Sequence, residues 1–99
     1  MPLQPNEVAS RIALASMMVG ICEGLAYARR AGVTPERALE AVESAVALAS
    51  HEAPRILQGD YEAGLSIARF LDEMAGALQA AEQMSVDVPG LELAQMLYG

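Results

Sequence analysis

The chain has 99 residues, of which 54% are hydrophobic and only 4% aromatic, so its apolar mass is a helix-favouring mixture of aliphatic residues sufficient for one small domain. Its formal net charge of −7 argues against nucleic acid or an anionic membrane as a partner, because both are polyanions. The N-terminus lacks the basic and apolar regions of a signal peptide, and one cysteine cannot form an internal disulfide. We therefore expect a soluble cytoplasmic protein that binds neither nucleic acid nor membrane.

The predicted fold class is all-α, because apolar residues recur at helical spacing and no segment shows the alternation of a strand. A single domain over residues 1–99 is expected to contain about five helices. Their expected ranges are residues 7–31, 35–48, 52–58, 65–84 and 90–98.

Capping residues predict where the helices begin and end. Asn6 is expected to cap the first helix, since its side-chain oxygen can accept a hydrogen bond from a backbone amide. Gly32 is expected to follow the end of that helix in the left-handed conformation. Thr34 as N-cap and Pro35 at the first helical position begin the second helix. Pro54 is expected in the first turn of the short third helix.

The later helices are amphipathic and the methionines suit a core. The second helix is expected to bury a stripe formed by Leu39, Val42 and Val46. The long fourth helix has one apolar face, made of Ile67, Phe70, Leu71, Met74, Leu78 and Ala81. The methionines expected to fill the core are Met17, Met18, Met74, Met84 and Met96.

The first helix is apolar around its whole circumference. Such a helix must be buried on all sides, and four shorter helices are too few to cover it. Small side chains recur on it at every fourth position, which lets another backbone approach closely. They form the expected dimer interface and are Ser16, Gly20, Gly24 and Ala28. The uncovered surface predicts an obligate homodimer or a missing partner domain. A membrane span is not expected, because the uncharged run between Arg11 and Glu23 is shorter than the roughly 20 residues required.

Patterns for catalysis or cofactor binding are missing from the sequence. It contains no glycine-rich phosphate turn after a strand and no lysine, which excludes Schiff-base chemistry within the chain. His51 has no second histidine or cysteine beside it to complete a metal site. We expect a solvated or capping role for His51, and Cys22 is expected to be a small buried hydrophobe rather than a nucleophile.

Three carboxylates are candidates for function. Glu23 lies deep in an apolar helix and needs a polar partner, either an arginine or the end of another helix; alternatively it lines a cleft shared with another domain. Asp72 and Glu73 are adjacent, so on a helix they point about 100° apart and cannot form a catalytic pair. A solvated face is expected there.

Two segments together resemble a known family. They are ICEGLAYARRAGVTPERALEAVES, residues 21–44, and APRILQGDYEAGLSIARFLDEMAGALQAAEQMSVDVPGLELAQMLYG, residues 53–99. Their order and spacing are similar to the C-terminal helical domain of the β-hydroxyacid dehydrogenases, which include 3-hydroxyisobutyrate dehydrogenase and 6-phosphogluconate dehydrogenase. The resemblance implies a long first helix that makes subunit contacts. It also implies a separate N-terminal Rossmann domain that binds NAD or NADP, and these 99 residues contain no such domain.

The residues on which the family's chemistry depends are replaced. The family's catalytic lysine and the asparagine four positions later correspond to Glu7 and Arg11, counted back from Glu23, and a second lysine corresponds to Asp72. A carboxylate does not polarise a substrate oxygen as an ammonium group does. The resemblance therefore implies no catalytic residue here, and NAD or NADP only together with a Rossmann partner.

The leading hypothesis is a stand-alone helical domain for dimerisation or for closing a substrate cleft, not catalytic by itself. One alternative is half of a split NAD(P)-dependent hydroxyacid dehydrogenase that works with a separate Rossmann domain. Another is an engineered or recombined domain.

Overall fold

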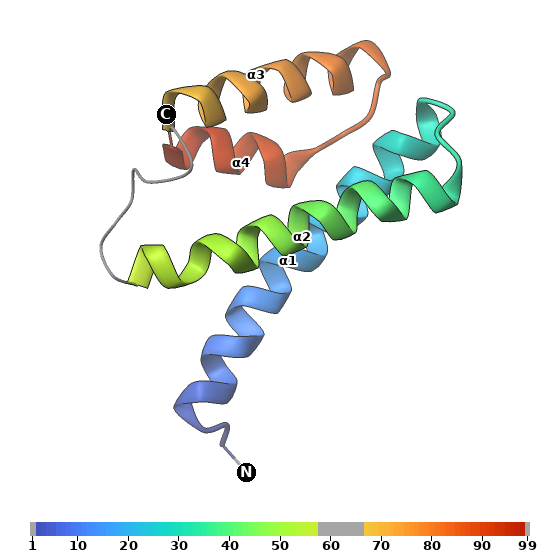
Figure 1. The fold of residues 1–99 in the computed structure, drawn as a ribbon. Coiled ribbons are helices and arrows are strands. Elements are labelled where there is room, and N and C mark those ends of the chain that lie inside the picture. The colour runs from blue at the N-terminus through green and yellow to red at the C-terminus, as the bar shows by residue number, and fades with distance from the viewer. Residues whose placement is uncertain (1, 58–66, 99) are drawn as a thin grey trace.

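The computed structural model describes residues 2–57 and 67–98. These residues form helices and connecting turns without a strand, which confirms the all-α prediction (Figure 1). The helices are α1 (Pro5–Arg30), α2 (Pro35–Leu57), α3 (Ile67–Gln83) and α4 (Pro89–Tyr98).

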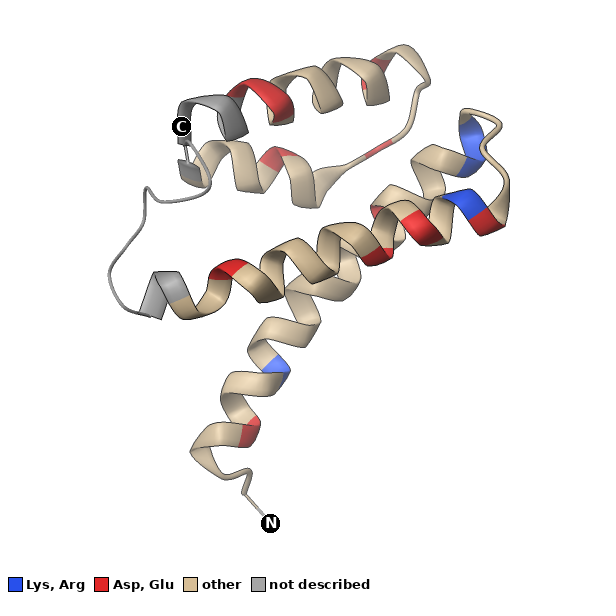
Figure 2. Ribbon diagram, viewed as in Figure 1, with Lys and Arg blue, Asp and Glu red and all other residues tan. Residues whose placement is uncertain are grey.

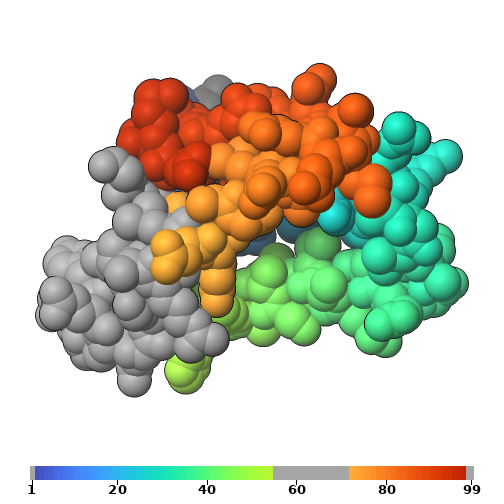
Figure 3. Space-filling model, turned by 90° about the horizontal axis from the view of Figure 1, so that it is seen from above, coloured from blue at the N-terminus to red at the C-terminus, as the bar shows by residue number. Residues whose placement is uncertain are grey.

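The helices form two pairs. Helix α1 packs on α2, α3 packs on α4, and α4 joins the pairs by packing on α1 (Figure 1). Seen from above, openings remain between the atoms of α2 and those of α3 (Figure 3). Residues 5–16 of α1, which we call the arm, project beyond the other helices (Figure 1).

Helix α1 begins two residues earlier than expected. Gln4, not Asn6, is the N-cap, and the Gln4 N–H donates to Oε1 of Glu7 at 3.2 Å. Pro5 suits the first helical position because its missing N–H would have had no intrahelical partner there. The prediction for Asn6 was wrong because Glu7 can reach back to an earlier residue, and Asn6 lies inside the first turn.

The predicted end of α1 is confirmed. Gly32 has φ +85°, its N–H donates to the carbonyl of Arg29 at 3.2 Å, and the N–H of Val33 donates to the carbonyl of Ala28 at 2.9 Å. This pair of bonds is a Schellman motif, which satisfies carbonyls that a helix end leaves free.

Helix α2 begins as predicted but is longer than predicted. Oγ1 of Thr34 accepts a hydrogen bond from the N–H of Arg37 at 3.4 Å, as an N-cap does. The helix then continues through Pro54 to Leu57, so the ranges 35–48 and 52–58 belong to one helix and the chain has four helices in its described part. Pro54 removes a single backbone bond because it lacks an N–H, and it lies in the last turn. The predicted end, Gln58, lies outside the described residues, as do residues 65 and 66 at the predicted start of the next helix.

The packing of α2 on α1 differs by one residue from the predicted stripe. Ala38 is 5% exposed whereas Leu39 is 51% exposed, and Val42 and Val46 are half-buried. A Cβ at Gly24 would lie 3.5 Å from Cγ2 of Val42. The small residue at position 24 therefore brings α2 of the same chain close to α1.

The α3–α4 pair contains most of the buried core. Met74, Ala81 and Val88 are buried and Leu78 is half-buried, which confirms this part of the predicted α3 face. The side chains of Ile67, Phe70 and Leu71 lie outside the description. The core role predicted for the methionines holds for Met74 alone. The exposed ones are Met17, Met18, Met84 and Met96.

Helix α3 ends in a second Schellman motif with serine in the glycine position. The N–H of Val86 donates to the carbonyl of Ala81 at 2.9 Å, and Ser85 has φ 56°. Nε of Arg30 donates to the neighbouring carbonyl of Met84 at 3.0 Å. Because the left-handed conformation is unfavourable for residues with a Cβ, position 85 carries backbone strain that glycine would not.

We expect Ser85→Gly to raise the free energy of unfolding by about 0.5–1 kcal/mol, since relief of strain exceeds the added chain entropy. Urea denaturation at fixed protein concentration measures this. Ser44→Gly, at an exposed interior position of α2, is the matched control and should be destabilising by a similar amount. Equal destabilisation by both changes would contradict the assignment of strain.

The chain exposes more surface than a compact protein of its size. Its accessible area is 7732 Å², against about 5,400 Å² expected for a folded monomer of this mass. Its radius of gyration is 15.0 Å, against about 13 Å for a compact domain. The surplus is about 2,300 Å², and α1 contributes to it because this helix has no buried residue. Its exposed large apolar side chains are Val8, Ile12, Leu14, Met17, Met18 and Val19.

Length and composition alone would allow α1 to span a membrane. The charged residues of α1 argue against a membrane as the surface that covers this helix. Arg11 and Glu23 are separated by only eleven uncharged residues, a rise of roughly 17 Å against a hydrocarbon core of about 30 Å. A spanning α1 would therefore place at least one of these two charges inside the hydrocarbon.

Candidate interaction groove and the Glu23 cap

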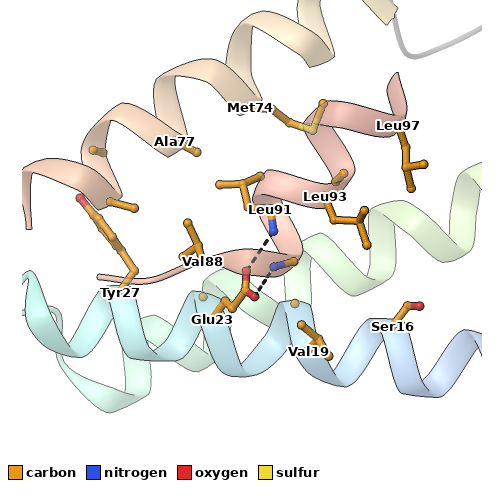
Figure 4. Close-up of a pocket in the computed structure, with 16 residues that line it drawn as sticks. Ser16, Val19, Glu23, Tyr27, Met74, Ala77, Val88, Leu91, Leu93 and Leu97 are labelled. Carbon is orange, nitrogen blue, oxygen red and sulfur yellow. Dashed lines mark hydrogen bonds between the residues drawn. The ribbon is translucent and has the colours of Figure 1, made fainter. Parts of the chain in front are cut away.

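A cavity of about 1040 Å³ opens between α1, α3 and α4. We call it the α1–α4 groove, and Figure 4 shows the side chains around it. Apart from Ser16, Glu23 and Tyr27, its lining is Val19, Gly20, Gly24, Met74, Ala77, Ala80, Ala81, Val88, Gly90, Leu91, Leu93, Ala94 and Leu97. The groove is thus suited to an apolar surface.

Glu23 is bonded to the N-terminus of α4. Its Oε2 accepts from the N–H of Gly90 at 2.6 Å, and its Oε1 accepts from the N–H of Leu91 at 3.1 Å (Figure 4). Val88, just before the helix, has no side-chain acceptor, and Pro89 at the first position has no N–H to satisfy. Glu23 therefore does for α4 what an N-cap side chain does, and its charge suits the positive end of the helix dipole.

This geometry bears out one of the predicted roles of Glu23. The carboxylate is a cap on another helix, and both of its oxygens are used in that role. Glu23 also lines the groove, where it marks the point at which α4 is held on α1.

Gly90 makes the close approach of α4 possible. A Cβ at this position would lie 2.8 Å from Oε2 of Glu23 and 2.8 Å from Cγ1 of Val19, so the contact requires a residue without a side chain. Gly90 was not among the predicted functional residues. The available signal was a proline followed by glycine at the start of a helix that has no capping side chain of its own.

Three of the predicted interface residues, Ser16, Gly20 and Gly24, line the groove, and Ala28 is half-buried beyond it. A Cβ at Gly20 would meet no other described atom within 4 Å, apart from its own helix backbone. The surface of α1 at Gly20 is therefore open within the described part of the chain. The dimer interface itself stays a prediction.

The positions that correspond to the family's catalytic residues do not come together at the groove. Glu7 and Arg11 lie on the arm, and Asp72 lies on α3; none of them lines the groove. Asp72 and Glu73 are both exposed, as expected for a solvated face.

The other candidates show no catalytic arrangement. His51 is exposed inside α2 rather than at its end. Cys22 is exposed, so the expectation of burial was wrong within this chain, because α2 and α4 pack on other sides of α1. Across residues 2–57 and 67–98, no group of three or more His, Cys, Asp or Glu side chains is placed to hold a metal ion.

The groove does not fit the phosphates of a dinucleotide. Among the described residues, no arginine lines it, and the charged side chain that does is the Glu23 carboxylate, which would repel a phosphate. The basic residues Arg29, Arg30 and Arg37 lie instead around the turn between α1 and α2 (Figure 2). The described part of the chain also has no strand from which a glycine-rich phosphate loop would extend.

A family model and two curated proteins that match this chain point to the same family. The family model for the NAD-binding domain of NADP-dependent 3-hydroxyisobutyrate dehydrogenase matches residues 7–99. The Uncharacterized oxidoreductase YkwC of Bacillus subtilis (strain 168) is 39% identical over 98 residues, which cover 96% of this chain and 34% of that protein. The Probable 3-hydroxyisobutyrate dehydrogenase-like 1, mitochondrial, of Arabidopsis thaliana is 35% identical over 95 residues, which cover 93% of this chain and 28% of that protein.

The chain spans about a third of the length of these relatives. No solved structure gives a significant match. Since the family model covers nearly all of the sequence, the chain belongs to the NAD-binding family of NADP-dependent 3-hydroxyisobutyrate dehydrogenase.

Proposed function

We propose that this chain is a helical association domain of a 3-hydroxyisobutyrate dehydrogenase-like oxidoreductase, and that it performs no chemistry by itself. The observation that carries the proposal is the surplus of exposed surface on the chain, about 2,300 Å², together with the lack of any buried residue along α1. An obligate homodimer buries about 2,000–5,000 Å² in total, so a surplus of this size matches one subunit's share of such an interface. The partner is a second copy of the chain.

In this proposal NAD or NADP binds to a different domain. The chain corresponds to the C-terminal helical part of the longer relatives, and NAD or NADP binds only where a Rossmann domain supplies the phosphate site. The absence of lysine and the acidic, apolar lining of the groove support this division of roles.

Light scattering and calorimetry test the two halves of the proposal. The chain should have the mass of a dimer at micromolar concentration. Titration with NAD or NADP should release no heat of binding. A stable folded monomer would contradict self-association, and saturable binding of either dinucleotide would contradict the absence of a cofactor site.

A second candidate is half of a split hydroxyacid dehydrogenase, favoured by the coverage of only about a third of each relative. Mixing the chain with a separately produced Rossmann domain of such a relative tests it. Oxidation of a small hydroxy acid by the mixture, and by neither part alone, would favour this candidate over the first.

A further inference from the structure

We infer that the α3–α4 pair opens as a unit, leaving α1 while the α1–α2 pair stays folded, and that the bonds between Glu23 and α4 hold it closed. The α3–α4 pair is thus a movable wall of the α1–α4 groove. This inference goes beyond the proposed self-association and does not depend on it, since every contact that it uses lies within one chain.

The α3–α4 pair has a narrow attachment to the rest of the chain. It packs on α1 through α4, and openings remain between the atoms of α3 and those of α2 (Figure 3). Hydrogen bonds join the two pairs at two places. Both carboxylate oxygens of Glu23 accept from the start of α4, and Nε of Arg30 donates to the carbonyl of Met84 in an exposed position. Release of the α3–α4 pair leaves the contacts within the α1–α2 pair intact, and a unit attached in this way opens at a lower free energy than the whole chain.

Helix α4 depends on this attachment. It has 10 residues, and isolated helices shorter than about 12–15 residues are marginal in water. Val88 and Pro89 supply no capping side chain, so the first amides of α4 are satisfied by Glu23, which belongs to α1. Leu93 and Met96 are 52% and 73% exposed, so packing within the chain adds little. Away from Glu23, α4 loses its cap and α3 loses the helix on which it packs.

The α1–α2 pair keeps its own contacts when the α3–α4 pair leaves. Its helices have 26 and 23 residues. The turn between them is fixed by bonds within the pair, from the N–H of Val33 to the carbonyl of Ala28 and from the N–H of Arg37 to Oγ1 of Thr34. Ala38 is buried in α2, the helix that packs on α1. The pair therefore retains its caps and its packing.

Opening changes the surface that the groove presents. Val19 and Tyr27 line it from α1, whereas Met74 and Leu93 line it from the α3–α4 pair (Figure 4). Release of that pair exposes the side chains of α1 to solvent. A molecule that contacts both walls would favour the closed state, whereas one that contacts only α1 would favour the open state.

Amide hydrogen exchange of the intact chain, followed by NMR at one fixed concentration, tests the separate opening. When reclosing is faster than exchange, the exchange rate of an amide is proportional to the population of the state that exposes it. The slowest amides of α3 and α4 should exchange at least about tenfold faster than the slowest amides of α2. Glu23→Ala should speed exchange in α3 and α4 at least about thirtyfold, because it removes the bonds that close the pair. Glu43→Ala, at an exposed position of α2, should leave those rates unchanged.

Two matched changes of alanine to glycine show whether the pairs open separately. Ala38 of α2 is 5% exposed and Ala81 of α3 is 2% exposed, so each change removes a buried methyl group and weakens a helix. Ala81→Gly destabilises the closed α3–α4 pair and should speed exchange at least about fivefold in α2, α3 and α4 alike. Ala38→Gly affects a helix that is intact in both the closed and the open state. It should therefore speed exchange at least about fivefold in α2 but less than about twofold in α3 and α4.

The outcomes separate this inference from unfolding of the chain as one cooperative unit. Equal exchange rates for the slowest amides of α2, α3 and α4 would overturn separate opening, as would an effect of Ala38→Gly on α3 and α4 as large as its effect on α2. Unchanged exchange in Glu23→Ala would overturn the role of Glu23 in holding the pair closed. The proposed self-association is tested separately, by the mass of the chain in solution.

Discussion

Glu23→Ala is expected to lower the free energy of unfolding by about 2–3 kcal/mol, because hydrogen bonds to a charged group are stronger than neutral ones and their loss leaves two amides unpaired. The amides of Gly90 and Leu91 both donate to this carboxylate, and α4 has no capping side chain of its own. Urea denaturation followed by circular dichroism at fixed chain concentration measures the effect, since dimerisation makes stability depend on concentration.

Two comparisons isolate the cap from a general effect of removing charge. Glu23→Gln keeps one acceptor oxygen and should lose about half as much stability. Glu43→Ala removes an exposed carboxylate of α2 and should change stability by less than about 0.5 kcal/mol. The role of Glu23 would be disproved by equal stabilities of Glu23→Ala and Glu43→Ala.

Ile12→Asp is expected to convert the dimer into a monomer, with dimerisation weakened at least about a hundredfold. Ile12 is 66% exposed in the single chain, so the substitution removes little of the chain's own packing. In the proposed dimer the exposed apolar face of α1 is covered by the second copy, and burial of an unpaired carboxylate there is costly. Because each subunit of a symmetric dimer carries the substitution, the free-energy cost of burial occurs twice in each dimer.

Met18→Asp is the matched control for this prediction. Met18 is also an exposed apolar residue of α1, 45% accessible, and both changes place aspartate inside a helix. Met18 lies about 120° around the helix from Ile12, however, and sedimentation should still show a dimer. Monomers from both variants, or from neither, would argue against the Ile12 face of α1 as the interface.

Local rules in the sequence predicted the features that depend on local contacts. The Schellman motif at Gly32 and the cap at Thr34 follow from residues a few positions apart, and both are confirmed. At the start of α1 two local solutions compete, and the pairing of Gln4 with Glu7 excluded the cap predicted at Asn6.

Features that depend on distant parts of the chain were not predictable in detail. The bond between Glu23 and Gly90 joins residues 67 positions apart, and the sequence showed only that Glu23 needed a partner. The burial of Ala38 in place of Leu39 is decided by the direction from which α2 meets Gly24. In contrast, the excess of apolar surface on α1 could be read from the sequence, because it is a property of one helix.

Sedimentation equilibrium of the wild-type chain over a range of concentrations tests most directly whether α1 is covered by a second copy. The monomer mass is 10.4 kDa. A helical species of twice this mass through the micromolar range, dissociating only on dilution, is the predicted result. A folded, stable species of the monomer mass at every concentration would contradict it.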